Sequence, residues 1–292
     1  MQHTYGIQDF PVPALGLGAG RIGDPALDDA QVGTLLGQAL DMGVTLIDTA
    51  PSYGLSEERI GRHLAHRRAD YILSTKVGYG IPGHEDWSYG SVAAGIDAAL
   101  RRLRTDYLDI VHLHSCPLET LQRGNVIRAL HEARAQGKLR VAAYSGENAA
   151  LQWAITSGHF GGIECSVNLF DQRCLEHDLP MAQARGIGVI AKRPLANFPW
   201  RFAKRPIGDY CEEYWLRWQA MGIKANDVDW PELALRFAAH APAVSCAIVG
   251  TTSTEHLLQD KLHVDYGPLP PERFESLRRA FRNHDDNWIG LI

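Results

Sequence analysis

The sequence predicts an α/β protein with the (β/α)8 barrel fold, also called a TIM barrel, as a single domain over residues 1–292. Short apolar runs rich in β-branched residues alternate with amphipathic helical patterns along the whole chain, and no change in composition marks a domain boundary. The apolar runs mostly lack polar alternation, as in strands buried on both faces, and their connections are short. A doubly wound sheet is the alternative. It usually shows a G-x-G-x-x-G turn, of which residues 16–20 are only a fragment.

Eight strand–helix units can be followed in order along the chain. The strands are expected at residues 14–18, 44–48, 71–76, 108–114, 139–144, 162–168, 188–192 and 245–249. Helices are expected at 28–42, 56–64 with Ser56 as N-cap, 91–104, 118–136, 149–156, 179–184, 232–239 and 254–261, and one more at 270–283. A short extension precedes the first strand, and an aromatic-rich insertion around residues 198–218 precedes the eighth.

Composition and charge narrow the class of protein. The net charge of −5 argues against nucleic acid as a partner. The five cysteines form no C-x-x-C pair, which fits a reducing cytoplasm and thiols that act as small apolar side chains. No signal-like segment opens the chain, and no apolar run reaches the roughly 18 residues of a membrane span. We therefore expect a cytoplasmic protein that acts on a small molecule, with no membrane partner. Its oligomeric state stays open.

Four side chains that can take part in a reaction follow neighbouring strands. Asp48 ends the second strand and Tyr53 follows it in the next turn, Lys76 ends the third, and His114 ends the fourth. The carboxyl ends of all strands in a parallel barrel open onto one mouth, so we expect these four groups to meet there. Each alone has a plainer interpretation, such as an Asx turn for Asp48.

The expected chemistry of this group is proton transfer. A tyrosine titrates near 10 in water. An ammonium about 4 Å away in an intermediate dielectric is worth roughly 4 kcal/mol to the phenolate, or about three pKa units. We therefore expect Lys76, held by Asp48, to lower the pKa of Tyr53. His114 can donate a hydrogen bond to a carbonyl oxygen above the phenol, and such a set protonates an alkoxide as it forms.

These residues and several other segments resemble the aldo-keto reductase family over nearly the full chain. The matching segments are Asp48-Thr-Ala-Pro-Ser-Tyr53-Gly, Ser74-Thr-Lys76-Val-Gly, Tyr107-Leu-Asp-Ile-Val-His-Leu-His114-Ser, Val167-Asn168-Leu, Arg193-Pro-Leu195 and Gly250-Thr-Thr-Ser253. The resemblance implies hydride transfer between a nicotinamide cofactor and an aldehyde or ketone. It implies Tyr53 as general acid and base, Lys76 and Asp48 as the groups that tune it, and His114 as the group that orients the carbonyl.

The same resemblance implies a cofactor site without a Rossmann domain. Residues 250–253 stand between a strand and a helix, where backbone N–H groups and the positive helix terminus favour a phosphate. Glycines at 18 and 20 allow close backbone approach. The implied cofactor residues are Gly18, Ala19, Gly20, Arg21, Asp48, Ser145, Gly146, Glu164, Lys192, Arg193, Pro194, Leu195, Gly250, Thr251, Thr252, Ser253, His256, Gln259 and Asp260.

The chain departs from the common family pattern within this set. Glu164 replaces a frequent glutamine that meets the carboxamide, and Lys192 a frequent stacking tyrosine. Gly250, His256 and Asp260 replace a frequent lysine, arginine and asparagine. The loss of two cations weakens the case for NADPH over NADH. The cations available to replace them are Lys192, Arg193 and Lys261. Family habit favours NADP(H), with NAD(H) as the alternative.

The sequence leaves the substrate and two other functions open. The aromatic side chains expected to line a substrate pocket are Tyr79, Trp87, Phe198 and Trp200. One alternative function is a barrel that binds nicotinamide and senses redox state with little turnover. A more distant one is a metal-dependent hydrolase that uses the His112-x-His114 pair. Because no second histidine pair occurs at another strand end, we expect no metal, and we expect His112 to be an interior residue with a satisfied hydrogen bond.

Overall fold

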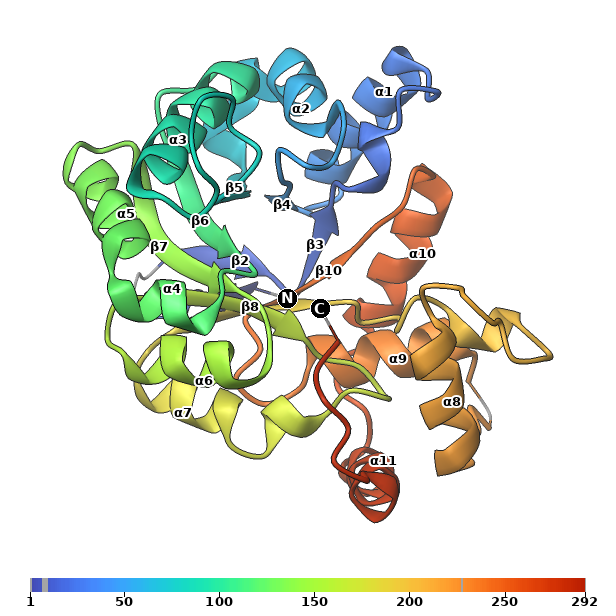
Figure 1. The fold of residues 1–292 in the computed structure, drawn as a ribbon. Coiled ribbons are helices and arrows are strands. Elements are labelled where there is room, and N and C mark those ends of the chain that lie inside the picture. Colours follow the sequence, from blue (N-terminus) through green and yellow to red (C-terminus); the bar gives the residue numbers. More distant parts are fainter. Residues whose placement is uncertain (1, 7–9, 227, 292) are drawn as a thin grey trace.

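The computed structural model describes residues 2–6, 10–226 and 228–291, and its centre is a closed barrel of eight parallel strands (Figure 1). The strands, in barrel order, are β3 (Leu15–Gly18), β4 (Leu46–Asp48), β5 (Ile72–Val77), β6 (Leu108–His114), β7 (Leu139–Ser145), β8 (Gly162–Ser166), β9 (Gly188–Lys192) and β10 (Cys246–Val249). β10 pairs with β3 and closes the ring. The predicted fold class is therefore confirmed, and the doubly wound alternative is excluded.

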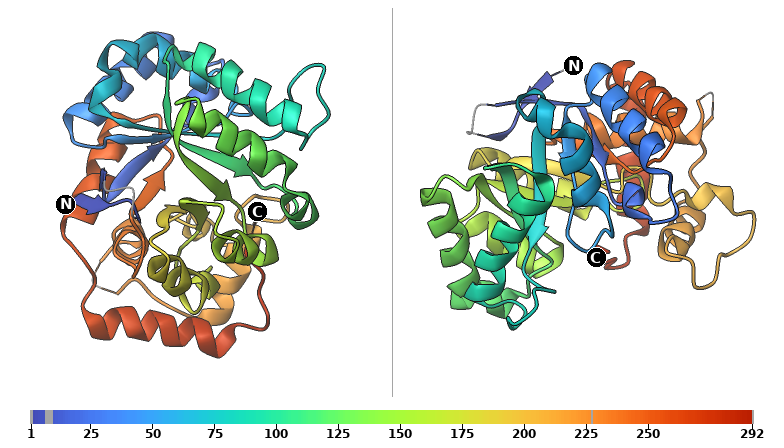
Figure 2. Two further views of the ribbon diagram at one scale, coloured as in Figure 1. Left: turned by 90° about the vertical axis from the view of Figure 1, so that its left-hand side faces the viewer. Right: turned by 90° about the horizontal axis from the view of Figure 1, so that it is seen from above.

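Helices surround the barrel and cover its outer face (Figures 1 and 2). They are α1 (Asp29–Asp41), α2 (Ser56–Leu64), α3 (Tyr89–Leu103), α4 (Leu118–Arg123), α5 (Asn125–Ala135), α6 (Asn148–Thr156), α7 (Asp178–Ala184), α8 (Glu212–Met221), α9 (Trp230–Ala239), α10 (Thr254–Asp265) and α11 (Pro271–His284). None of the helices in the described part of the chain is long and apolar enough to cross a membrane.

Two local predictions about the helices are wrong. The single helix expected at 118–136 is two helices, because Gly124 between them has φ +79° and ends α4 in the left-handed region. Ser56 is the first residue of α2 and does not cap it. Its hydroxyl donates instead to the carbonyl oxygen of Ala19 at 2.8 Å, which ties α2 to the loop after the first barrel strand.

A short hairpin closes the end of the barrel opposite the candidate site. β1 (Gln2–Thr4) pairs antiparallel with β2 (Pro11–Pro13), two strands that the sequence patterns did not indicate. The fully buried Tyr5 ring stacks on Phe10 with ring centres 5.4 Å apart. Gly162 and Gly188 begin β8 and β9, where an added Cβ would lie 2.2 and 2.6 Å from Tyr5 atoms. Both strands therefore begin with glycine because the tyrosine ring fills this end of the barrel.

The insertion and the C-terminal segment lie on one side of the barrel, beside α9 (Figure 1). The insertion contains the expected aromatic residues and forms α8. After α11 the chain turns back, and its last described residues are held by backbone contacts: Arg217 donates to the carbonyl of Ile289 at 2.8 Å, and Arg193 to that of Leu291 at 2.9 Å. The two termini lie at opposite ends of the barrel (Figure 2).

The loop between β3 and α1 packs against the turn that carries Tyr53. Gly23 contacts this turn so closely that an added Cβ would lie 1.6 Å from the carbonyl oxygen of Tyr53. The buried Arg59 holds the loop from α2, donating to the carbonyls of Ile22 at 2.6 Å, Asp24 at 2.8 Å and Leu27 at 2.7 Å. The position of the tyrosine backbone therefore depends on this loop.

We predict that Gly23→Ala lowers the free energy of unfolding by about 2 kcal/mol or more, because the contacted atoms are backbone and must move. The matched control is Gly37→Ala in α1, where an added Cβ meets no atom within 4 Å. That change should raise the unfolding free energy by about 0.5–1 kcal/mol, since alanine favours the helix. Urea denaturation of the three proteins measures both effects. Equal stability of the two variants would contradict the close packing.

Candidate active site

A cavity of about 410 Å³ opens at the carboxyl ends of the strands, and the four residues predicted to act together meet in it. Asp48, Tyr53 and His114 line the cavity, and Lys76 lies beneath them with 1 % of its surface exposed. The register of the strands explains the meeting: Asp48 on β4 pairs with Ser74 on β5, and Lys76 pairs with His112 on β6. Neighbouring strand ends thus carry Asp48, Lys76 and His114, and the turn after β4 carries Tyr53.

The ion pair between Lys76 and Asp48 is the innermost feature of the site. Lys76 Nζ donates to Asp48 Oδ2 and to the carbonyl of Thr49 at 3.2 Å, while Ser74 Oγ donates to Asp48 Oδ1 at 2.8 Å. Burial opposes the charge on Lys76, but the carboxylates of Asp48 and Glu164 outweigh it and raise the pKa of the ammonium. The lysine is therefore a fixed positive charge across the physiological range.

The pKa of Tyr53 is raised, whereas the sequence predicts that it is lowered. The Lys76 ammonium, 5.4 Å from the ring centre, favours the phenolate and is the largest single influence on it. Burial and the negative charges of Asp48 and Glu164 together exceed that influence, and the pKa of Tyr53 rises to about 12. The predicted lowering of this pKa is wrong, because it considered the lysine without the two carboxylates that accompany it. Tyr53 is consequently a neutral O–H donor at pH 7.

His114 faces Tyr53 edge to face, with ring centres 6.1 Å apart. Burial and the charge of Lys76 lower the pKa of His114 to about 3, so its imidazole is neutral. Tyr79 stacks on the ring, and its hydroxyl lies 2.8 Å from His114 Nδ1. With Tyr79 as the donor, Nδ1 accepts and Nε2 carries the proton, which is the tautomer that can donate to a carbonyl oxygen.

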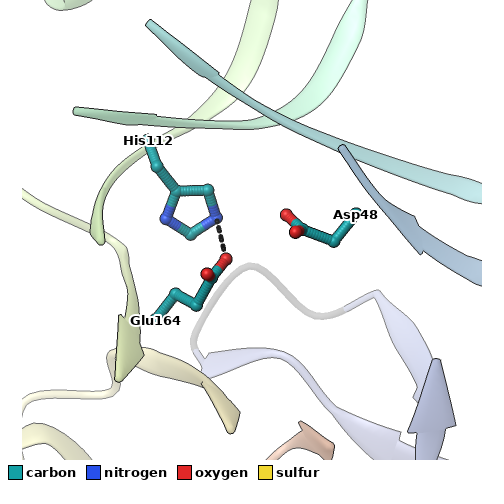
Figure 3. Close-up of side chains that lie close together, drawn as sticks. All are labelled: Asp48, His112 and Glu164. Carbon is teal, nitrogen blue, oxygen red and sulfur yellow. Dashed lines mark ion pairs between the residues drawn. The ribbon is translucent and has the colours of Figure 1, made fainter. Parts of the chain in front are cut away.

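A second carboxylate, Glu164, lies beside the first. Figure 3 shows it with Asp48 and His112, and one ligand-type atom from each of these three lies within 4.8 Å of the others. Glu164 Oε2 is 3.3 Å from Lys76 Nζ and 3.8 Å from His112 Nε2. The ammonium of Lys76 already supplies a cation to both carboxylates. His112 is fully buried and lies 3.1 Å from Ser74 Oγ, as expected of an interior histidine, and the arrangement does not favour the His112–His114 zinc hypothesis.

Many of the residues implied for the cofactor surround the same cavity. Those that line it are Gly18, Gly20, Arg21, Asp48, Ser145, Glu164, Lys192, Arg193, Pro194, Leu195 and Gly250. The others, Ala19, Gly146, Thr251, Thr252, Ser253, His256, Gln259 and Asp260, lie outside its lining. Ser253 caps α10, its hydroxyl accepting from the backbone N–H of His256 at 3.2 Å. The N-cap of the helix therefore lies three residues after the cavity wall at Gly250, and the helix begins at Thr254, as a phosphate site there requires.

The sequence analysis named three cations that could replace the two missing at the cofactor site. In the structure, all three have other partners. Lys192 pairs with Glu147 at 3.1 Å, and Lys261 pairs with Asp265 one turn along α10. Arg193 donates to the carbonyl of Leu291 at 2.9 Å. Arg21 is instead the cation beside Gly250, with its Cδ 3.9 Å from the position of an added Cβ. Sequence reasoning placed Arg21 in the site but did not assign it this role.

The four aromatic side chains expected in a substrate pocket are placed differently from one another. Phe198 lines the cavity, and Tyr79 contacts His114 at its edge. Trp87 packs on Tyr79 with ring centres 5.4 Å apart. Trp200 of the insertion stacks on Trp230 of α9 with ring centres 5.5 Å apart, and it does not line the cavity. Sequence reasoning missed five lining residues, Ser115, Asn197, Tyr210, Ile248 and Val249. The aromatic content of the insertion was the only signal that pointed towards Tyr210.

Fold and site together define a (β/α)8 barrel with a cavity lined by titratable side chains at the carboxyl ends of its strands. The family model "Aldo/keto reductase family" matches residues 14–281. The chain belongs to the aldo/keto reductase family, and it is an oxidoreductase by that membership.

The similar proteins align with most or nearly all of this chain. The uncharacterized oxidoreductase YqkF of Bacillus subtilis is 26% identical over 298 residues, covering 95% of each protein. The L-galactose dehydrogenase of Arabidopsis thaliana is 32% identical over 209 residues, covering 66% of this chain and 65% of that enzyme. Among solved structures, the holo form of aldo-keto reductase AKR11C1 from Bacillus halodurans superposes with a TM-score of 0.82 at 26% identity, covering 96% and 95%. An aldo/keto reductase from Klebsiella pneumoniae, in complex with NADP and acetate, gives 0.74 at 26% identity, with the same coverage.

We predict a pH-dependent contribution of His112 to stability. Burial lowers the pKa of His112 to about 4, below the 6.5 of an unfolded histidine. The unfolded chain therefore binds the extra proton first, so this contribution is complete above pH 6.5 and is lost as the pH falls towards 4. The difference between these two pKa values corresponds to about 3 kcal/mol of unfolding free energy. The stability difference between the wild type and His112→Gln should shrink by that amount from pH 7 to pH 4 in denaturant titrations. His66→Gln, at an exposed histidine, should show no such change. A pH-independent difference for His112→Gln would contradict the assignment.

Proposed function

We propose that this chain is an NAD(P)H-dependent oxidoreductase that reduces an aldehyde or ketone to the alcohol and catalyses the reverse oxidation. The observation that carries the proposal is the meeting of Tyr53, Asp48 and His114 in one cavity with Lys76 buried against Asp48, on a barrel of the aldo/keto reductase family. A nicotinamide dinucleotide supplies or accepts the hydride when it is bound. The substrate is a small carbonyl compound or alcohol, in keeping with the size of the cavity.

The protein's own groups perform the proton transfer. Tyr53 is neutral at pH 7, so it can give its proton to the oxygen of a carbonyl as negative charge develops there. The phenolate formed faces Lys76, whose positive charge stabilises it. His114 carries no charge and donates from Nε2 to the same carbonyl oxygen, which fixes its orientation. In the reverse direction the phenolate takes the proton of the alcohol.

Specific features of the chain support the cofactor site. The backbone at Gly18, Gly20 and Gly250 borders the cavity without side chains, and the N-terminus of α10 follows closely. Arg21 beside Gly250 offers a positive charge for a phosphate. Family membership and the NADP named for the Klebsiella pneumoniae structure favour NADP(H), with NAD(H) as the alternative.

We predict that Tyr53→Phe binds the dinucleotide with unchanged affinity and loses turnover by about 10²–10⁴-fold, the usual contribution of a general acid. Tryptophan quenching measures the binding, and the loss of NADPH absorbance over a panel of aldehydes measures the turnover. The matched control is Tyr266→Phe, which removes the hydroxyl of an exposed tyrosine at the end of α10. Turnover retained by Tyr53→Phe would refute the mechanism. The alternative, a barrel that senses redox state, predicts tight binding and no turnover by the wild type. The complete set of four groups does not favour it.

We predict that NADPH binds at least tenfold more tightly than NADH, about 1.4 kcal/mol. If Arg21 supplies the charge for the additional phosphate, Arg21→Ala should remove most of this preference and leave NADH affinity nearly unchanged. Titration of the wild type and the variant with both dinucleotides tests it. Arg101→Ala, at an exposed helix position, is the control. Equal affinities in the wild type would assign the protein to NADH.

A further inference from the structure

The buried part of the site carries more negative than positive charge. Asp48 and Glu164 are each 2 % exposed and Lys76 is 1 % exposed, so two carboxylates share one ammonium. The two nearest histidines do not correct the balance, because burial lowers the pKa of His112 to about 4 and that of His114 to about 3. Above the pKa of about 7 to which burial raises Asp48, this group therefore carries one net negative charge.

Arg21, Lys192 and Arg193 also line the cavity, but among the described residues the cation that pairs with Glu164 is Lys76. On β9, Lys192 is the next cation, and it already pairs with Glu147 at 3.1 Å. β7 contributes Ser145, whose hydroxyl donates to Glu164 Oε1 at 3.2 Å, and β5 contributes Ser74. The remaining oxygen of the glutamate, Oε2, is buried and accepts no hydrogen bond from the described residues. Its contacts are the ion pair with Lys76 and the neutral imidazole of His112, whose Nε2 is 3.8 Å away.

The negative charge matters because the two forms of a nicotinamide differ in charge. The oxidised ring is a cation, and the reduced ring is neutral. For a hydride to reach a carbonyl carbon above Tyr53, the ring must occupy the same cavity, and Glu164 forms part of its wall. A buried carboxylate acts on a charge in such a cavity with little screening by solvent.

We propose that Glu164 determines the oxidation state of the cofactor that this protein binds best, giving the site a preference for the oxidised dinucleotide over the reduced one. The inference rests on the proposed function, because it requires that a nicotinamide enters the cavity. Asp48 and Lys76 form the closer ion pair, so Glu164 is the carboxylate of this group whose charge the ammonium compensates less. Glu164 thus acts as a residue that sets specificity between two forms of one ligand.

Equilibrium binding, without any turnover, tests the proposal. The dissociation constants of NADP⁺ and NADPH, and of NAD⁺ and NADH, are measured by tryptophan quenching at pH 8, above the pKa of about 7 to which burial raises Asp48. The proteins are the wild type, Glu164→Gln, Glu164→Asp and Glu119→Gln. Glu164→Gln keeps the size and removes the charge, Glu164→Asp keeps the charge, and Glu119→Gln makes the same chemical change at an exposed position of α4.

We expect the wild type to bind the oxidised form at least tenfold more tightly than the reduced form. Glu164→Gln should reduce this ratio by tenfold or more, while Glu164→Asp and Glu119→Gln should keep the preference. A wild type that prefers the reduced form overturns the proposal whether or not the glutamine variant folds. An unchanged ratio in Glu164→Gln, with binding retained, overturns it as well and leaves the proposed function standing. Failure of the wild type to bind any of the four dinucleotides overturns both.

Discussion

The buried ammonium of Lys76 is the constraint on which the site depends. A lysine at 1 % exposure is tolerated only because carboxylates compensate it, and here Asp48 and Glu164 do so from two strands on either side of the barrel interior. Removal of either partner would change the charge that Tyr53 and His114 experience. The acidity of the phenol, the neutrality of the imidazole and the field in the cavity are therefore consequences of one buried cluster, not separate properties of four residues.

The barrel supplies this cluster through its strand register, and the loops then position the groups that are not on strands. Tyr53 lies in a turn, and its backbone is fixed by contact with Gly23, whose loop is in turn held by three carbonyl contacts from Arg59. His114 ends a strand, and the hydroxyl of Tyr79 from the neighbouring loop lies 2.8 Å from its Nδ1. A rigid scaffold with fixed loops is the arrangement that proton transfer requires, because the donor must already lie within hydrogen-bond distance of the substrate.

Some elements could be read from the sequence because their signals are local. Apolar runs of β-branched residues located all eight barrel strands to within a few residues, and the four polar groups at strand ends could be placed at one mouth by the rule for parallel barrels. The N-terminal hairpin had no such signal: β1 and β2 have three residues each, and β2 begins and ends with proline. The break at Gly124 was missed, although a glycine followed by asparagine is a local signal for the end of a helix.

The sequence by itself determined the fold, the family resemblance and the identities of the reacting groups, since these depend on periodicity and on residue types near strand ends. Only the tertiary structure decided how those groups interact. Glu164 is 88 positions from Lys76, yet its carboxylate meets the same ammonium as Asp48. Burial of the phenol, Asp48 and Glu164 together raise the pKa of Tyr53 against the effect of the lysine. Likewise Lys192 forms an ion pair with Glu147, and Arg21 is the cation that lies beside Gly250. Charge interactions depend on distance and burial, and neither is encoded in the local spacing of residues along the chain.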